Sequence, residues 1–202
     1  MIDFFYPPQP TRIWPNSPLL QSLAATKEWD AEIKYNGWRL LLFKLSKKDL
    51  LFYNRHSTII DIDTKRFEPF FHDLPINSVL DGELIDRRTT DLKNTIVFWD
   101  VPFYDGVDLR NKPLKERRPL LDIFTVAPAK FHNEGVQVYK IQQFYSNFLD
   151  LYNTIVKHNE PCEEGIVLKK TSSTYRSHPS RGIDVLDWLK IRKIGDHARV
   201  DR

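Results

Sequence analysis

The sequence predicts an α+β protein that is built mainly on antiparallel sheets with flanking helices. Short apolar or alternating runs, typical of strands, follow one another without the regular strand-helix alternation of a doubly wound fold. The chain has 202 residues, of which 41% are hydrophobic and 13% aromatic, enough for one substantial core. It contains no internal repeat, low-complexity tract or credible interdomain linker. We therefore expect one domain over residues 1–202.

The N-terminal part of the chain is expected to begin with an extended arm. Residues 1–18 contain five prolines, which disfavour a helix because proline lacks the backbone donor. A short helix over residues 19–27 should follow. Asn36-Gly37 then lies between apolar runs, a pattern typical of a two-residue turn between paired strands. It predicts an antiparallel hairpin over residues 30–45.

The remaining elements follow from the same patterns. Strands are expected over residues 50–54, 79–86, 96–103, 136–141, 165–170 and 187–191, and a helix over residues 64–71. Pro113 suits a first helical turn, and the helix after it should have a basic exposed face. Ser146 is the expected cap of a further helix that continues through Val156.

Bulk properties limit the compartment and the partners. Cys162 is the only cysteine, so no internal disulfide forms and a reducing, intracellular compartment is expected, cytoplasmic or, in a eukaryote, nuclear. Its thiol should be inert, because the neighbouring carboxylates of Glu163 and Glu164 raise its pKa. No apolar run approaches the roughly 20 residues that span a bilayer, so no membrane partner is expected.

Charge is distributed unevenly along the chain. The net charge is +3, and residues 165–202 hold nine Lys and Arg against four Asp, which leaves +5 there and −2 elsewhere. A basic stretch with interleaved aromatic residues suits a phosphate backbone. A solvated sheet edge explains it equally well when it is considered alone.

Lys34, beside the Asn36-Gly37 turn, is the candidate for chemistry. Alone it would be a solvated lysine, because such short motifs recur freely. Six further motifs follow it in order: Phe52-Tyr53-Asn54-Arg55, Leu80-Asp81-Gly82-Glu83-Leu84, Val97-Phe98-Trp99-Asp100-Val101, Pro113-Leu114-Lys115-Glu116-Arg117-Arg118, Glu164-Gly165-Ile166-Val167-Leu168-Lys169 and Trp188-Leu189-Lys190-Ile191-Arg192-Lys193. The ordered set resembles the covalent nucleotidyltransferase superfamily, and most closely the ATP-dependent DNA ligases.

The resemblance covers about residues 28–193 and implies a ligase adenylation fold of the nucleotidyltransferase, ATP-grasp-like type. It implies ATP and magnesium as cofactors and nicked duplex DNA, or RNA, as the partner. Lys34 would accept AMP as a lysyl-AMP phosphoramidate, and the AMP would then pass to a 5′-phosphate. The amine must be neutral to attack, and the cations Arg39, Lys190 and Arg192 would favour that form while they offset phosphate charge.

The resemblance implies roles for the other site residues as well. Glu32 would lie near the adenine amino group, Arg39 near the ribose or phosphate, Arg55 near a phosphate, and Glu83 near the ribose hydroxyls. Trp99 would stack on adenine, with Phe98 as the alternative, because adjacent strand residues point to opposite faces. Glu164 would hold magnesium through its hard oxygens. Lys190 would contact the α-phosphate or the metal-bridged oxygens.

The sequence departs from the family pattern at three points. Asn36 replaces the usual aspartate, Arg192 replaces the usual second lysine, and no OB-fold domain follows the last motif. A minimal enzyme, a separate OB-fold or DNA-clamping partner, or a longer parent chain would each explain the last point. An RNA ligase, a capping guanylyltransferase and a non-catalytic nucleic-acid-binding scaffold remain alternatives.

Overall fold

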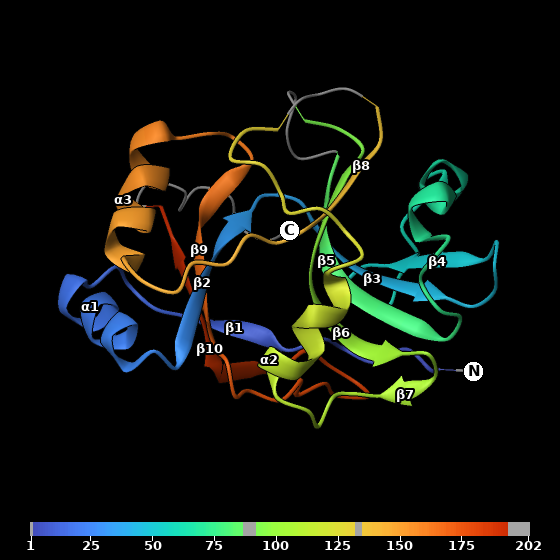
Figure 1. Cartoon of the computed structure of the whole chain (residues 1–202), viewed down its shortest axis with the longest axis horizontal. Coiled ribbons are helices and arrows are strands. Elements are labelled where there is room, and N and C mark those ends of the chain that lie inside the picture. Colours follow the sequence, from blue (N-terminus) through green and yellow to red (C-terminus); the bar gives the residue numbers. More distant parts are fainter. Residues whose placement is uncertain (1, 87–91, 132–134, 194–202) are drawn as a thin grey trace.

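The computed structural model describes residues 2–86, 92–131 and 135–193. Two sheets lie beside each other, with two helices at the outer edge of one and a short helix near the middle of the molecule (Figure 1). The α+β prediction is confirmed, and most strand pairs are antiparallel. In the described ranges, no helix is long and apolar enough to cross a membrane.

The first sheet has four strands in the order β1-β10-β9-β2. These are β1 (Gln9–Arg12), β10 (Asp184–Arg192), β9 (Glu163–Lys170) and β2 (Trp29–Tyr35). Helices α1 (Ser17–Thr26) and α3 (Phe148–His158) cover one face of this sheet (Figure 1). Their apolar side chains pack on Ala31, Ile166 and Leu168. The opposite face of the sheet is left for polar side chains.

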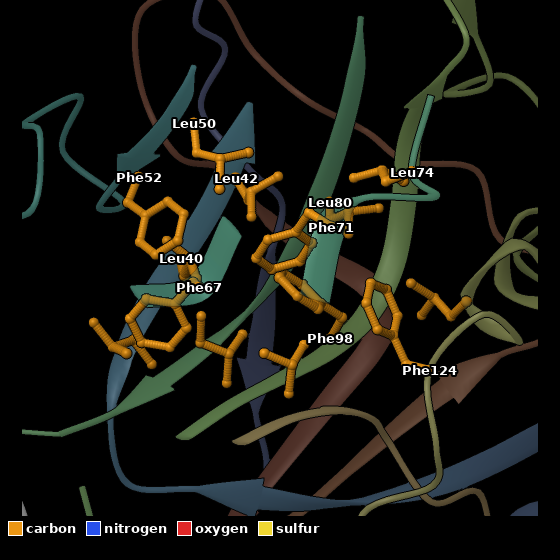
Figure 2. Close-up of a cluster of buried hydrophobic side chains, with 14 of the residues drawn as sticks. Leu40, Leu42, Leu50, Phe52, Phe67, Phe71, Leu74, Leu80, Phe98 and Phe124 are labelled. Atoms are coloured by element: carbon orange, nitrogen blue, oxygen red, sulfur yellow. The ribbon is translucent and has the colours of Figure 1, made fainter. Parts of the chain in front are cut away.

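The second sheet contains β4 (Leu50–Tyr53), β3 (Trp38–Lys44), β5 (Ser78–Ile85), β6 (Thr95–Tyr104) and β7 (Val107–Asp108), in that order. Strand β8 (Gln137–Lys140) pairs in parallel with β6. The main core lies against this sheet, where Leu40, Leu42 and Phe98 meet the aromatic rings of the 3-10 helix η1 (Thr64–Phe71) (Figure 2).

The predicted hairpin over residues 30–45 is wrong. Strand β2 pairs with β9 of the first sheet, and β3 pairs with β4 and β5 of the second. Neither Asn36 nor Gly37 has the positive φ that a tight hairpin turn requires. Gly37 is needed for close approach instead, because a Cβ there would lie 2.4 Å from the carbonyl oxygen of Leu84. The turn carries the chain from one sheet to the other.

Two of the predicted helices also differ from expectation. The basic segment after Pro113 forms the short helix α2 (Leu114–Arg117) and the 3-10 turn η2 (Arg118–Leu121). Arg117 and Arg118 are buried in ion pairs rather than exposed, because acidic side chains of β2 and β6 face them. Helix α3 is preceded by Asn147, with a left-handed backbone, in place of the expected Ser146 cap.

The N-terminal arm is extended as predicted, but α1 begins at Ser17, so the arm ends before residue 18. Its strand β1 pairs in parallel with β10 of the first sheet. Its Phe5 is buried against Phe43 and Phe103 of the second sheet, with ring centroids 6.0 and 5.6 Å away. The arm thus contacts both sheets.

Candidate functional site

A cleft of about 420 Å³ lies between the two sheets and collects all the predicted site residues. The first sheet contributes Glu32, Lys34, Glu164, Lys190 and Arg192, and the second contributes Arg39, Glu83 and Trp99. Arg55 follows β4 at the rim, where its Nε donates to His56 Nε2 at 3.0 Å. Positions that are far apart in sequence therefore share one cavity.

Lys34 lies near the end of β2, opposite Gly165 of β9. Its ammonium donates to Glu164 Oε2, and Arg192 Nε lies 3.5 Å from the same oxygen. The Lys34 side chain is 19% exposed, so a ligand in the cleft can reach it. Lys190 is two residues before Arg192 on β10, and alternation along the strand places both on the cleft side. Three cations thus surround the Glu164 carboxylate at this end of the cleft.

Trp99 makes one end of the cleft aromatic. Phe98 is fully buried in the main core, whereas Trp99 lines the cleft. The Arg39 guanidinium carbon lies 4.9 Å from the Trp99 ring centroid, and Lys169 Nζ lies 5.1 Å from it. Phe98 and Trp99 therefore point to opposite faces of β6, as strand alternation predicted, and Trp99 is the one on the cleft side.

Glu32 is a buried carboxylate that is held by cations. Lys169 Nζ lies 2.8 Å from Glu32 Oε2, and an Arg118 amino group donates to Glu32 Oε1. Burial raises the pKa of Glu32, and the positive charges of Lys169 and Arg118 oppose that rise. Both of its oxygens thus have protein partners while the side chain lines the cleft.

Arg39 is fixed by a second ion pair. Its Nε and one amino group each lie 2.5 Å from an oxygen of Asp81, and the Tyr175 hydroxyl donates to Asp81 at 2.8 Å. Burial alone would lower the pKa of Arg39, but Asp81 raises it above its ordinary value. The guanidinium is therefore a permanent cation whose plane is set by the fork geometry.

Glu83 lies on β5 and accepts a hydrogen bond from the Gly37 amide at 2.9 Å. Burial raises its pKa to about 7, with Lys34 lowering it and Glu164 raising it. The contact ties the turn after Lys34 to the second sheet. It also places a carboxyl group that titrates near neutrality beside the candidate nucleophile.

Four further residues support the predicted site residues without having had a role assigned from the sequence: Lys169, Arg118, Asp81 and Tyr175. Asp81 precedes Glu83 by two positions on β5, so strand alternation could have found it. Lys169 ends the motif that begins at Glu164, but the two are five positions apart, so alternation alone does not place them on one face. The inert thiol predicted for Cys162 is consistent with its surroundings: burial, and next Glu163, raise its pKa to about 11.

The fold and the site define a nucleotidyltransferase core of the ligase type. Over residues 85–192, more than half of the chain, the sequence matches the family described as ATP dependent DNA ligase domain. The chain belongs to this family.

Similar proteins agree with this assignment. The chain is 32% identical to the SPbeta prophage-derived DNA ligase-like protein LigB of Bacillus subtilis (strain 168), over 79% of this chain and 59% of LigB. It therefore spans less than two thirds of the length of that relative. A mycobacterial DNA ligase D, solved with ATP and MES, has the same fold, with a TM-score of 0.65 and 20% identity over 93% of this chain and 60% of that one.

An archaeal ATP-dependent RNA ligase also has this fold, with a TM-score of 0.52 and 18% identity over 92% of this chain and 48% of that one. The fold is therefore shared by ligases that are named for DNA and for RNA. Preference for one nucleic acid has to come from features other than the fold.

Proposed function

We propose that this chain is the adenylation core of an ATP-dependent polynucleotide ligase that seals nicks in DNA. The supporting observation is the position of Lys34: it is partly exposed, contacts Glu164 together with Arg192, and lines the same cleft as Lys190 and Trp99. A nucleotide with its base on Trp99 and its phosphates among these cations would place the α-phosphorus near the lysine.

In the first step, the Lys34 Nζ lone pair attacks the α-phosphorus of ATP. A nitrogen–phosphorus bond forms, the bond from that phosphorus to the bridging oxygen breaks, and pyrophosphate leaves with the electron pair. The Nζ ammonium gives up one proton to water to become the neutral nucleophile, which weakens its ion pair with Glu164, and it gives up a second proton to water when the nitrogen–phosphorus bond forms. Lys190 and Arg192 offset the charge that builds up on the phosphate oxygens.

Magnesium fits this donor set as an ion held largely by substrate phosphates. Across the described segments, no group of three or more His, Cys, Asp or Glu side chains is arranged to hold a metal ion. Magnesium is commonly bound through one or two carboxylates plus phosphate oxygens and water. Glu164 would supply the carboxylate, because its oxygens lie at the phosphate end of the cleft. The ion would supply positive charge against the negative charge of the reacting phosphates.

In the later steps, the AMP would pass from Lys34 to the 5′-phosphate at a nick, and the neighbouring 3′-hydroxyl would displace AMP. Arg55, which lines the cleft, would contact a phosphate of the nucleic acid. A clamping partner, either a separate OB-fold protein or another part of a longer chain, would hold the duplex. Family membership favours DNA over RNA as the substrate.

The adduct itself tests this proposal. Purified protein incubated with ATP and magnesium should gain the mass of one AMP on Lys34, measured on the intact protein and located by peptide mapping. Lys34→Ala should gain nothing, and the exposed Lys47→Ala is the matched control that should label normally. An unlabelled but folded wild-type protein would favour the non-catalytic scaffold, and labelling from GTP in preference to ATP would favour a guanylyltransferase.

A further inference from the structure

Arg118 connects three groups around the aromatic end of the cleft without lining the cleft itself. One amino group donates to Asp30 Oδ2 at 2.5 Å, and the other donates to Glu32 Oε1. Its Nε donates to the backbone carbonyl of Trp99 at 3.3 Å. Asp30 and Glu32 belong to β2 in the first sheet, and Trp99 belongs to β6 in the second. One guanidinium thus fixes the two sheets relative to each other.

The neighbouring arginine shows what a purely structural role looks like. Arg117 is equally buried and pairs with Asp100, with its Nη2 2.7 Å from Oδ2. Its remaining donors go to the carbonyls of Lys112 and Ser173, and none goes to a residue that lines the cleft. The Arg118 side chain, in contrast, donates to Asp30, Glu32 and the backbone carbonyl of Trp99.

The position of the Glu32 carboxylate depends on this contact. Asp30 and Glu32 are buried two residues apart on one face of β2, where two negative charges repel each other. Arg118 lies between them and gives a separate amino group to each, in the fixed geometry of a planar fork that a single ammonium lacks. Without the fork, Lys169 would be the remaining cation in contact with Glu32 among the residues described.

We propose that Arg118 is a positioning residue for base recognition, which holds the Glu32 carboxylate at a fixed place beside the Trp99 ring. An adenine ring on Trp99 would then present its 6-amino group to Glu32, while Arg118 stays outside the cleft. The inference rests on the proposed function, because it concerns the same nucleotide.

The test compares two substrates, ATP and purine riboside 5′-triphosphate, which lacks the 6-amino group. A hydrogen bond to a charged acceptor is worth enough that the wild-type protein should prefer ATP by roughly tenfold or more in the KM for lysyl-nucleotide formation. Arg118→Lys keeps the positive charge but loses the fork. It should reduce this preference to less than about threefold, with a larger change in KM for ATP than in the rate at saturation.

Arg117→Lys is the matched control, since it makes the same exchange at the adjacent buried arginine. It should lower the stability but keep the wild-type preference for ATP. Asp30→Asn is a milder second variant, which removes one charged partner of Arg118 and should give an intermediate preference. It allows the test to proceed if Arg118→Lys does not fold.

Each outcome has a distinct meaning. A wild-type protein that forms no adduct contradicts the proposed function. Adduct formation with no preference for the 6-amino group shows that Glu32 does not read the base, and it overturns the inference alone. A wild-type preference that persists in both Arg118→Lys and Asp30→Asn, or is lost equally in Arg117→Lys, shows that Arg118 has a structural role only.

Discussion

Glu83 and Glu164 both lie near Lys34, but their surroundings differ. Glu164 is paired with the Lys34 ammonium, whereas Glu83 is half-buried beside the turn and accepts a hydrogen bond from the Gly37 amide. Burial therefore raises the pKa of Glu83 from its usual 4.5 to about 7. The folded protein holds this proton more tightly than the unfolded chain does, and stability must depend on pH accordingly.

The first prediction concerns Glu83→Gln. The unfavourable free energy of the ionised Glu83 is fully present above pH 7 and disappears as the pH falls toward 4.5. The variant keeps an acceptor for Gly37 but cannot ionise, so it should be more stable than the wild type at pH 8, by on the order of 3 kcal/mol. Near pH 4.5 the two should be alike. Urea unfolding across this range measures the difference.

The exposed carboxylate of Glu116 offers the control, and Glu116→Gln should leave the pH dependence of unfolding as it is in the wild type. Glu83→Gln should also weaken lysyl-AMP formation, because the proposed ribose contact loses its charge. A variant with no stability gain at pH 8 would mean that Glu83 is better solvated than its burial indicates.

The second prediction concerns Trp99. Stacking of a base on an aromatic ring is worth about 1–3 kcal/mol, so Trp99→Ala should raise the ATP concentration needed for adduct formation roughly 5- to 150-fold. Trp99→Phe keeps a stacking face and should lie much nearer to the wild type. Titration of adduct formation against ATP measures both.

Phe98 provides the comparison on the same strand, because its ring is buried in the main core. Phe98→Leu should lower the free energy of unfolding and leave the ATP requirement unchanged. The reverse pattern, with Trp99→Ala silent and Phe98→Leu defective in ATP use, would transfer the base-binding role to Phe98.

At the scale of the elements, Gly165 controls how closely β9 and β10 approach beside the nucleophile. Its φ is +146°, and a Cβ there would lie 2.0 Å from the carbonyl oxygen of Ile191. Gly165→Ala should therefore separate the two strands where Glu164 and Arg192 meet. We expect a loss of stability together with a loss of adduct formation, measured by thermal unfolding and by mass.

Gly106 is the matched control, since its φ is +76° but its Cβ would meet nothing closer than Asn77 Cβ at 3.9 Å. Gly106→Ala should cost only the backbone strain of a left-handed residue, about 1–2 kcal/mol. If Gly165→Ala and Gly106→Ala lower the stability equally, the backbone conformation of Gly165 would explain the loss, and the close approach of the strands would not.

The strands themselves could be predicted from the sequence, because an apolar run of four to ten residues already indicates a strand. Their pairing could not. Asn36-Gly37 suits a local hairpin, and only the contacts of β2 with the distant β9, and of Gly37 with Leu84, decide against it. Sequence patterns indicate the local backbone conformation of a segment. The sheet that a strand joins depends instead on its contacts with residues far away in the sequence.

The candidate site was predictable in the same uneven way. The ordered motifs identified the nine predicted site residues, and all nine line the cleft, although the motif at residues 113–118 contributes none of them. Arg118 was expected on an exposed basic face, yet it is buried between two sheets. The available signal was Asp30 and Glu32, two acids on one face of an apolar strand, because buried acids need a cationic partner.

At the scale of the whole molecule, the cleft lies between the two sheets, and the N-terminal arm contacts both of them. Lys34 and Glu164 belong to the first sheet, and Glu83 and Trp99 to the second. The arm pairs with β10 on one side and buries Phe5 on the other. A nucleotide that touches both sides must therefore bind preferentially to the assembled pair of sheets.

Covalent attachment to Lys34 would make that nucleotide a reversible cross-link between the two sheets. Its phosphate would be bonded to Lys34 on one sheet while its sugar and base rest on the other, so unfolding would have to pull the base out of the cleft. The protein that carries AMP on Lys34 should therefore have a higher melting temperature than the protein without AMP. Transfer of the AMP to a nick should return the melting temperature to the lower value. The melting temperature would then report which fraction of the protein is in the lysyl-AMP state of the catalytic cycle.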